Sequence, residues 1–317
     1  MRTAENYRPV EEPEMTPSPE SREQEKRISS VIELQIFRHG DKEKDPTKTD
    51  EEILLTESGR LQANRVGQER AGERSADEGL SQSVTKGSRR KRTKDTGVHV
   101  MGGAAKLTTG TETFDEIKAK FDQGLKYGSK IGTDDRLNFD IDESTPFGAK
   151  AMEEFKAGRY LRFIVEQSDA LAESLHDEKA EPYSKTASKI AELIEGYIRS
   201  APRWDKLAND PSKHYEDTLR RYLGTHQGIG ESFIAKLIEE TKGIEGPEGR
   251  NAFVSALDNK GFGFVEGFNV RIETDNAGKR TVRISYEKPA DAKQPGFKFD
   301  EVVPEEVIQR MILSEKK

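Results

Sequence analysis

The chain of 317 residues contains no cysteine and one tryptophan, and none of its apolar runs approaches the length of a membrane span. The lack of cysteine excludes disulfides, thiolate zinc sites and a cysteine nucleophile. No apolar segment follows the first residues as in a signal peptide, so we expect a cytoplasmic protein with no membrane partner. The net charge of −7 has the wrong sign for a general nucleic-acid binder, so a nucleic-acid partner is not expected.

Charged residues (35%) outnumber apolar residues (32%), which is a polar composition for a chain of this length. Such a balance predicts tails or exposed insertions around an ordinary core. Residues 1–29 are polar and contain four scattered prolines, so they are predicted to form a disordered tail. Residues 30–317 are then expected to form a single domain, whose oligomeric state the sequence does not indicate.

Hydrophobic periodicity predicts strands that alternate with helices. Strands are expected over 31–37, 82–85 and 221–225, and helices over 57–70, 150–173, 184–199 and 230–242. Thr56 is an expected N-cap, and two alternating runs around Asn276-Ala277-Gly278 predict a hairpin. This order predicts an α/β fold with a mostly parallel sheet.

Two of the five histidines follow directly after predicted strands. His39 ends the first strand and His226 ends a later one. In open α/β sheets, ligands bind in the crevice outside the carboxyl ends of the strands. Glycines come next in both places (Gly40; Gly228 and Gly230), which would let the backbone approach a bound group closely. We therefore expect a site that contains both histidines.

Four landmarks occur in a fixed order between about residues 31 and 242. They are Arg38-His39-Gly40, the run Leu55-Thr56-Glu57-Ser58-Gly59-Arg60-Leu61-Gln62-Ala63, the spaced set Ser88, Arg92 and Thr96, and the pair Thr225-His226. In this order and spacing the chain resembles the histidine phosphatase (phosphoglycerate-mutase-like) superfamily. The resemblance implies a three-layer α/β sandwich. The long stretch between the last two landmarks suggests a helical insertion, at about 102–210, that forms a cap and shapes substrate choice.

The resemblance also implies a role for each landmark residue. His39 would be the nucleophile that accepts the phosphoryl group, because a neutral imidazole is nucleophilic at physiological pH. Arg38 and Arg92 would bind the phosphate oxygens, and His226 would donate a hydrogen bond to them. No metal or other cofactor is required by such a mechanism, and the sequence offers no clear metal cluster.

The general acid is harder to place. Gln227 follows His226, so the aspartate that some relatives carry directly after the second histidine is absent. The other location used in the family corresponds to about Phe139, next to Asp140, Asp142 and Glu143. Asp140 is our first choice, because Phe139 could bury it and keep its carboxyl group protonated.

The basic run over residues 86–94 allows several interpretations. Relatives usually carry small or apolar residues where Arg89 and Arg90 stand. The run could be a solvated face, a patch for a nucleic-acid backbone, or a landing surface for a polyanionic substrate. Only the spacing from Ser88 and Thr96 distinguishes Arg92 from its neighbours.

The leading functional hypothesis is a phosphoric monoester hydrolase that acts on a phosphorylated small molecule or a phosphoprotein. A mutase is possible within the same fold. The alternative is a catalytically weak or inactive relative that binds phosphorylated ligands through the same residues. Retained phosphatase turnover would separate the two.

Overall fold

The computed structural model describes residues 27–72, 80–123, 125, 128–292 and 294–313. Most of the predicted tail, residues 1–26, lies outside this part of the chain. The end of the tail was placed too late, because residues 28 and 29 already belong to the first strand.

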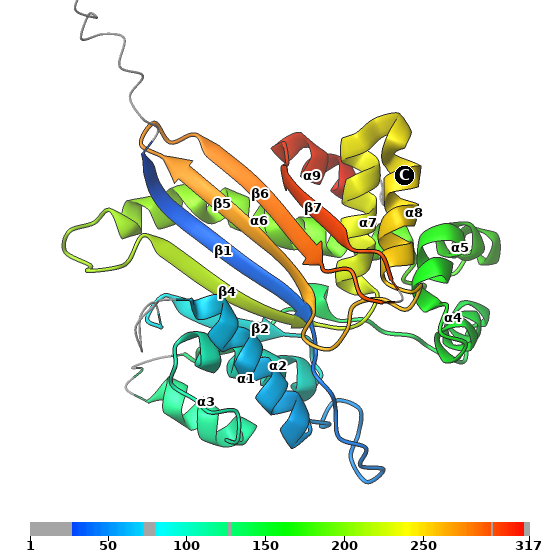
Figure 1. Cartoon of the computed structure of the whole chain (residues 1–317), viewed down its shortest axis with the longest axis horizontal. Coiled ribbons are helices and arrows are strands. Elements are labelled where there is room, and N and C mark those ends of the chain that lie inside the picture. The colour runs from blue at the N-terminus through cyan, green and yellow to red at the C-terminus, as the bar shows by residue number, and fades with distance from the viewer. Residues whose placement is uncertain (1–26, 73–79, 124, 126–127, 293, 314–317) are drawn as a thin grey trace, which may run out of the picture.

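The described residues form one mixed sheet of seven strands in the order β3-β2-β4-β1-β5-β6-β7 (Figure 1). Strands β3, β2, β4 and β1 are parallel to one another, and β5, β6 and β7 continue the sheet as an antiparallel meander. The α/β prediction is confirmed, and the site histidines lie in the parallel half. The strands are β1 (Ile28–Arg38), β2 (Ser83–Gly87), β3 (Ile131–Thr133), β4 (Thr218–Thr225), β5 (Gly267–Asp275), β6 (Arg280–Lys288) and β7 (Phe297–Val302).

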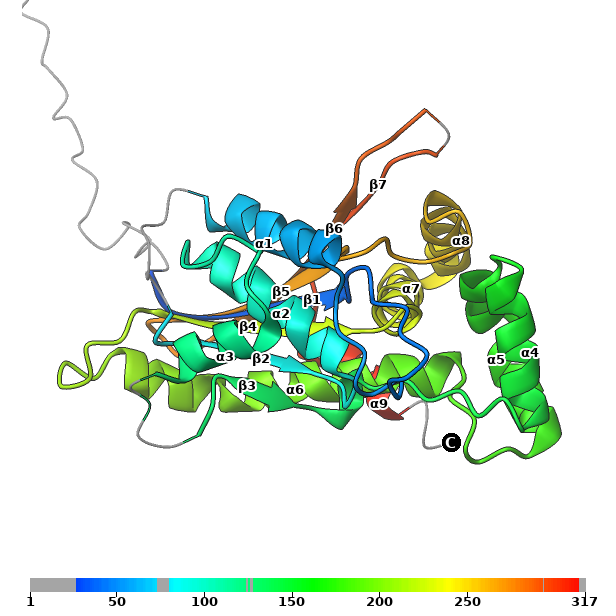
Figure 2. The same ribbon diagram turned by 90° about the horizontal axis from the view of Figure 1, so that it is seen from below.

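Helices cover both faces of the sheet (Figures 1 and 2). On one face α1, α2 and α3 bury Phe37 and Tyr222. On the other face α6, α7 and α9 enclose Leu34 and Ile36 in the larger core. The helices are α1 (Glu57–Ala71), α2 (Lys91–Ala104), α3 (Phe114–Asp122), α4 (Pro146–Lys156), α5 (Tyr160–Leu175), α6 (Tyr183–Ala208), α7 (Ile229–Lys242), α8 (Gly246–Ala256) and α9 (Glu305–Leu313), with short 3-10 turns η2 (Asp135–Leu137) and η3 (Gly243–Glu245).

Local sequence signals are confirmed where they were specific. Thr56 caps α1 by accepting a hydrogen bond of 3.0 Å from the Gly59 amide, and β5 and β6 form the predicted hairpin. The helix expected over 150–173 is two helices, because Gly158 has a φ of 69° between α4 and α5. Helix α2 was not predicted, since it begins inside the basic run and contains three glycines.

The region expected to form a cap, about 102–210, is divided in the structure. Strand β3 joins the sheet, α3 packs against α2, and α6 covers a face of the sheet. Helices α4 and α5 form a hairpin beside the end of the sheet (Figure 2), and α5 packs against α6 and α7. The prediction of a cap then concerns this hairpin.

Candidate active site

Three neighbouring strand ends bring the landmark residues together. Arg38 is paired with Thr225 in the register of β1 and β4, and the His39 amide donates a 2.9 Å hydrogen bond to the Thr225 carbonyl. The histidines that follow therefore lie side by side. Their ring centroids are 5.4 Å apart, and the angle between the ring planes is 68°. Ser88 follows β2 on the other side of β4, and its Oγ lies 2.8 Å from His226 Nε2. The structure thus places both predicted histidines in one site.

Helix α2 brings Arg92 to these strand ends. Gly224 of β4 makes this possible, because a Cβ there would lie 2.1 Å from the Thr93 carbonyl oxygen in the first turn of α2. One turn later, the Thr96 hydroxyl accepts a 3.0 Å hydrogen bond from the Gly40 amide. The spacing of Ser88, Arg92 and Thr96 therefore has a structural cause. Ser88 lies between the end of β2 and the start of α2, and Arg92 and Thr96 are one turn apart on α2.

His39 is held neutral and in one tautomer. Its Nδ1 lies 2.8 Å from the Gly40 carbonyl oxygen, which can only accept, so Nδ1 carries the proton and Nε2 keeps its lone pair. Burial, and after it the charges of Arg92 and Arg38, lower the pKa of His39 to about 3, against the opposing effect of the Gly40 hydrogen bond. A neutral imidazole with a free Nε2 is the form that a nucleophile needs.

His226 is also buried and neutral. Burial lowers its pKa well below the usual value, and His39, Arg92 and Arg90 add to the effect. If the Ser88 hydroxyl donates to Nε2, the proton of the ring stays on Nδ1. His226 then has one N–H available as a donor to a ligand.

The two predicted arginines each have a buried donor without a partner. Arg38 Nη1 donates to the Phe262 carbonyl at 2.5 Å, and its guanidinium lies 4.8 Å from the centre of the Phe264 ring. Arg92 Nη1 and Nη2 donate hydrogen bonds to the Asp50 carboxylate, and Nη1 also donates to the Asp50 carbonyl. In both residues the buried Nε–H finds no acceptor within the described part of the chain. An unsatisfied buried donor costs free energy, and the two guanidinium groups also concentrate positive charge beside the histidines.

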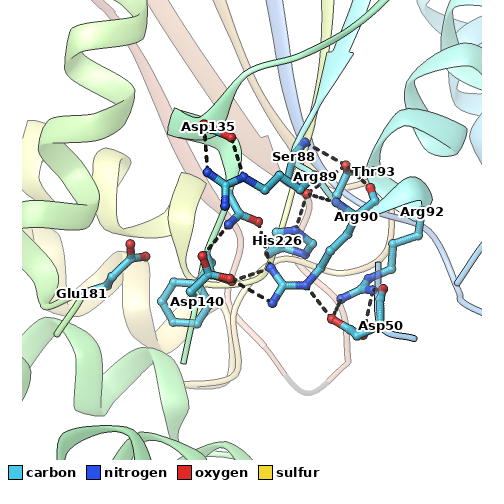
Figure 3. Close-up of polar contacts among 12 residues, drawn as sticks. Asp50, Ser88, Arg89, Arg90, Arg92, Thr93, Asp135, Asp140, Glu181 and His226 are labelled. Carbon is cyan, nitrogen blue, oxygen red and sulfur yellow. Dashed lines mark hydrogen bonds and ion pairs between the residues drawn. The ribbon is translucent and has the colours of Figure 1, made fainter. Parts of the chain in front are cut away.

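Asp50 and Arg90 belong to the site, although neither was predicted to do so. The Asp50 carboxylate lies between the guanidinium groups of Arg92 and Arg90 (Figure 3). Arg90 also donates to Asn138 and to the Phe139 carbonyl. Its proximity to His226 is reflected in the lowered pKa of that histidine. With a side chain that is 18% exposed, Arg90 is not part of a solvated face.

The basic run is largely paired with carboxylates. Lys86 contacts Asp134 at 3.6 Å, and Arg89 forms a bidentate pair with Asp135 at 2.9 and 3.0 Å. Such pairing does not leave the free row of cations that binding to a nucleic-acid backbone requires. The structure gives that interpretation no support.

Asp140, the first choice for the general acid, lies beside Arg90. Its Oδ1 is 3.3 Å from Arg90 Nη2, and its Oδ2 accepts a 2.6 Å hydrogen bond from Asn138 (Figure 3). The side chain is 64% exposed, so the burial by Phe139 that we expected is absent. The Phe139 ring packs instead against Tyr160. Asp142, the next candidate, accepts hydrogen bonds from Ser144 on an exposed turn.

Glu231 in α7 was missed by the sequence analysis. It is fully buried, and its two oxygens accept hydrogen bonds from the amides of Gly228 (2.9 Å) and Phe262 (2.7 Å). These amides belong to the turn after His226 and to the loop whose carbonyl binds Arg38. Burial raises the pKa of Glu231 to about 7. The available signal was a glutamate three residues after Gly228 at the start of a helix, which resembles half of a capping box.

The chain resembles the histidine phosphatases. No family model matches it, and no curated protein does. Solved structures similar to it include a mycobacterial glucosyl-3-phosphoglycerate phosphatase, with 14% identity and a TM-score of 0.41 over 85% of this chain and 97% of that one. A structure of a mycobacterial hydrolase 1 has 16% identity and a TM-score of 0.42 over 86% of this chain and 97% of that one. Another is a Hafnia alvei phytase, with 12% identity and a TM-score of 0.33 over 90% of this chain and 96% of that one. These likenesses are distant, so the functional argument rests on the residues of the site.

Two further observations concern the described residues only. None of their helices is both long and apolar enough to cross a membrane. No group of three or more histidines and acidic residues among them is arranged to hold a metal ion.

Proposed function

We propose that the chain is a phosphatase that hydrolyses a phosphomonoester through a phosphohistidine intermediate on His39. The observation that carries the proposal is the state of His39, which is buried, neutral and protonated on Nδ1, beside two arginines with unsatisfied Nε–H groups. The positive charge of these two guanidinium groups suits the negative charge on the oxygens of a phosphoryl group in transfer.

The first step breaks the bond between phosphorus and the leaving oxygen. His39 Nε2 donates its electron pair to phosphorus while Arg38, Arg92 and His226 donate hydrogen bonds to the phosphoryl oxygens. The leaving oxygen needs a proton, which the arginines cannot give. We assign this role to Asp140 as a proposal, since it stands at the edge of the site next to Arg90. In the second step water attacks phosphorus, loses a proton to Asp140 and releases inorganic phosphate and free His39.

A rapid-quench experiment with a substrate labelled on its phosphate tests the proposal. We expect a phosphoenzyme that is labile in acid and stable in alkali, and no labelled enzyme in the His39→Ala variant. A panel of phosphorylated metabolites and phosphopeptides would supply the substrate. Label on a serine, or full turnover by His39→Ala, would exclude the mechanism.

A second candidate function is binding of phosphorylated ligands without turnover. The observation that favours it is the apolar Phe139 at the usual position of the acid, together with the exposure of Asp140. Turnover by the wild type separates the two functions, and the Asp140→Asn variant tests the assignment of the acid. If Asp140 is the acid, this variant slows an alkyl phosphate far more than p-nitrophenyl phosphate, because nitrophenolate departs without protonation. A wild-type chain that binds phosphate but turns over neither ester would be a binding protein.

A further inference from the structure

One carboxylate in the site faces three cationic groups. Asp50 Oδ1 lies 2.9 Å from Arg92 Nη1 and 3.5 Å from Lys42 Nζ, and Oδ2 lies 2.5 Å from Arg90 Nε (Figure 3 shows the two arginines). A single negative charge leaves this group of cations under-neutralised. Arg90 has one other acidic contact, the exposed Asp140 at 3.3 Å. The cluster would therefore hold an anion of higher charge more strongly than it holds Asp50.

The Asp50 side chain can leave without dismantling the loop that carries it. The backbone of the loop is fixed separately, since the Glu51 carbonyl accepts a 2.8 Å hydrogen bond from the Lys91 amide. The Asp50 carbonyl also accepts from Arg92 Nη1 at 2.8 Å, so Arg92 keeps a contact that positions it. The Asp50 side chain is 50% exposed, whereas that of Arg92 is 7% exposed. Rotation of one side chain into water would open the cluster.

Arg90 offers this position a guanidinium that is already oriented. Its Nη1 is fixed by Asn138 and by the Phe139 carbonyl, which leaves the Nε edge directed at Asp50. A fixed guanidinium loses little conformational entropy when it binds an anion. Four other acids of the loop are engaged elsewhere: Glu43 and Asp45 contact Lys48, Glu52 contacts Thr49, and Asp41 accepts a hydrogen bond from Thr56.

We propose that Arg90, Arg92 and Lys42 form an anion subsite that Asp50 fills in the unliganded chain, and that a second anionic group of the substrate takes the subsite by displacing Asp50. The preferred substrates are then phosphomonoesters that carry a further phosphate or carboxylate group near the transferred phosphoryl group. This inference rests on the proposed function, because it takes the transferred group to lie at His39.

The test compares the affinities of inorganic phosphate and methylenebisphosphonate, measured by titration calorimetry without any turnover. The wild-type chain should bind the bisphosphonate about ten times more tightly than phosphate, as one additional charge-assisted contact allows. Arg90→Gln should abolish most of this preference and change phosphate affinity less. Asp50→Asn should increase it several-fold, because the competing carboxylate is gone.

Arg89→Gln is the matched control, since Arg89 is an exposed neighbour that pairs with Asp135 outside the subsite. Its preference should equal that of the wild type. Arg90→Lys, which keeps the charge, replaces Arg90→Gln if the latter does not fold, and should lose part of the preference.

Three results would overturn the subsite: an unchanged preference in the Arg90 variant, equal losses for both anions in Asp50→Asn, or no binding of either anion by the wild type. Equal losses would mean that Asp50 only positions Arg92. A parallel phosphatase assay keeps the two proposals apart. A chain that shows the expected preference but has no turnover retains the subsite and refutes the phosphatase.

Discussion

The chemistry of the site depends on two buried imidazoles that stay neutral among arginines. Burial excludes water from His39 and His226, and the neighbouring guanidinium groups make a positive charge on either ring unfavourable. The same environment that favours an incoming anion therefore also keeps the nucleophile unprotonated. A neutral, buried histidine nevertheless has a cost in stability that depends on pH.

This cost leads to a prediction for His39→Asn. In the unfolded chain His39 takes up a proton near pH 6.5, but in the folded chain it does so only near pH 3. The unfolded state binds more protons between these values, so stability falls as the pH falls below 6.5. The wild type should lose about 2 kcal/mol more than His39→Asn between pH 7 and pH 5. Urea denaturation at the two pH values measures the difference.

His176→Asn is the control, because His176 is an exposed residue in a left-handed conformation that asparagine also adopts. It should lose as much stability as the wild type. An equal loss in His39→Asn would show that His39 takes up its proton as an exposed histidine does.

Glu231 joins the two sides of the site, so its replacement should reduce activity. In Glu231→Gln the amide group has one acceptor oxygen, and its NH₂ would face the N–H of either Gly228 or Phe262. Leaving one buried N–H unsatisfied costs about 1–3 kcal/mol of unfolding free energy, and the displacement of the turn or the loop that holds His226 or Arg38 should lower kcat/KM. Glu240→Gln, on the same helix but paired with Arg310, should retain activity. Equal activities of the two variants would mean that Glu231 does not hold the site residues in position.

Residues that follow strand ends could be predicted from the sequence, and their partners could not. His39 and His226 carry a local signal, since each comes directly after an apolar run. Asp50 meets Arg90 across 40 positions in the chain, and Glu231 meets Phe262 across 31. Such contacts depend on how loops return to the sheet, which periodicity does not encode.

At the scale of elements, the site is a junction between the first turn of α2 and the end of β4. The helix approaches the strand closely, because Gly224 presents no side chain to Thr93. This contact sets the position of Arg92 relative to Thr225 and His226. The sequence did not predict α2, so it could place Arg92 only by spacing.

Gly224→Ala should therefore move α2 away from the sheet. The new Cβ would lie 2.1 Å from the Thr93 carbonyl oxygen, a backbone atom that cannot give way without moving the helix. We expect a loss of about 1–3 kcal/mol in unfolding free energy and a larger proportional loss of phosphate affinity. In β3, the Cβ of Gly132→Ala would lie 3.4 Å from the Lys86 side chain and 4.0 Å from the Thr85 carbonyl oxygen, which are ordinary contacts, so this variant should be tolerated. Thermal melts with and without phosphate test both variants, and unchanged phosphate affinity in Gly224→Ala would contradict the argument.

Arg92 itself should matter far more than its exposed neighbour Arg89. Removing a desolvated guanidinium that contacts the transferred phosphoryl group should cost on the order of 2–4 kcal/mol of transition-state stabilisation. Arg89→Ala removes only an exposed pair with Asp135 and should leave kcat/KM within about twofold of the wild type. Steady-state kinetics on one substrate compares the two. Equal, small losses would mean that Arg92 does not bind the phosphoryl group.

At the scale of the whole molecule, the two halves of the sheet differ in kind. The parallel half is covered on both faces and ends at the site, as the alternation of strands and helices predicted. In the antiparallel half, β5 and β6 alternate buried and less buried residues, which is typical of a sheet with one solvated face. The hairpin was predictable from this alternation and its turn, whereas β7, α8 and α9 carry weaker signals and were not assigned.

Because the loops from both sides of the sheet meet at the site, ligand binding should change amide hydrogen exchange mainly in these loops. Vanadate, which mimics a phosphoryl group in transfer, should slow amide hydrogen exchange in the loops over 41–56, 138–145 and 258–266. The last of these carries Phe264, whose ring lies 6.4 Å from that of His39. These segments have many exposed residues, so we expect their backbone hydrogen bonds to open locally and not with the whole fold. An anion that contacts all three loops stabilises the state in which these hydrogen bonds are formed. Strands β6 and β7 contribute no described residue to the site and should be unaffected.

The His39→Ala variant is the control, since it removes Nε2, the atom that would bind vanadate. Vanadate should protect the three loops less in this variant. Protection spread evenly over the chain, or absent from all three loops, would show that the anion binds elsewhere.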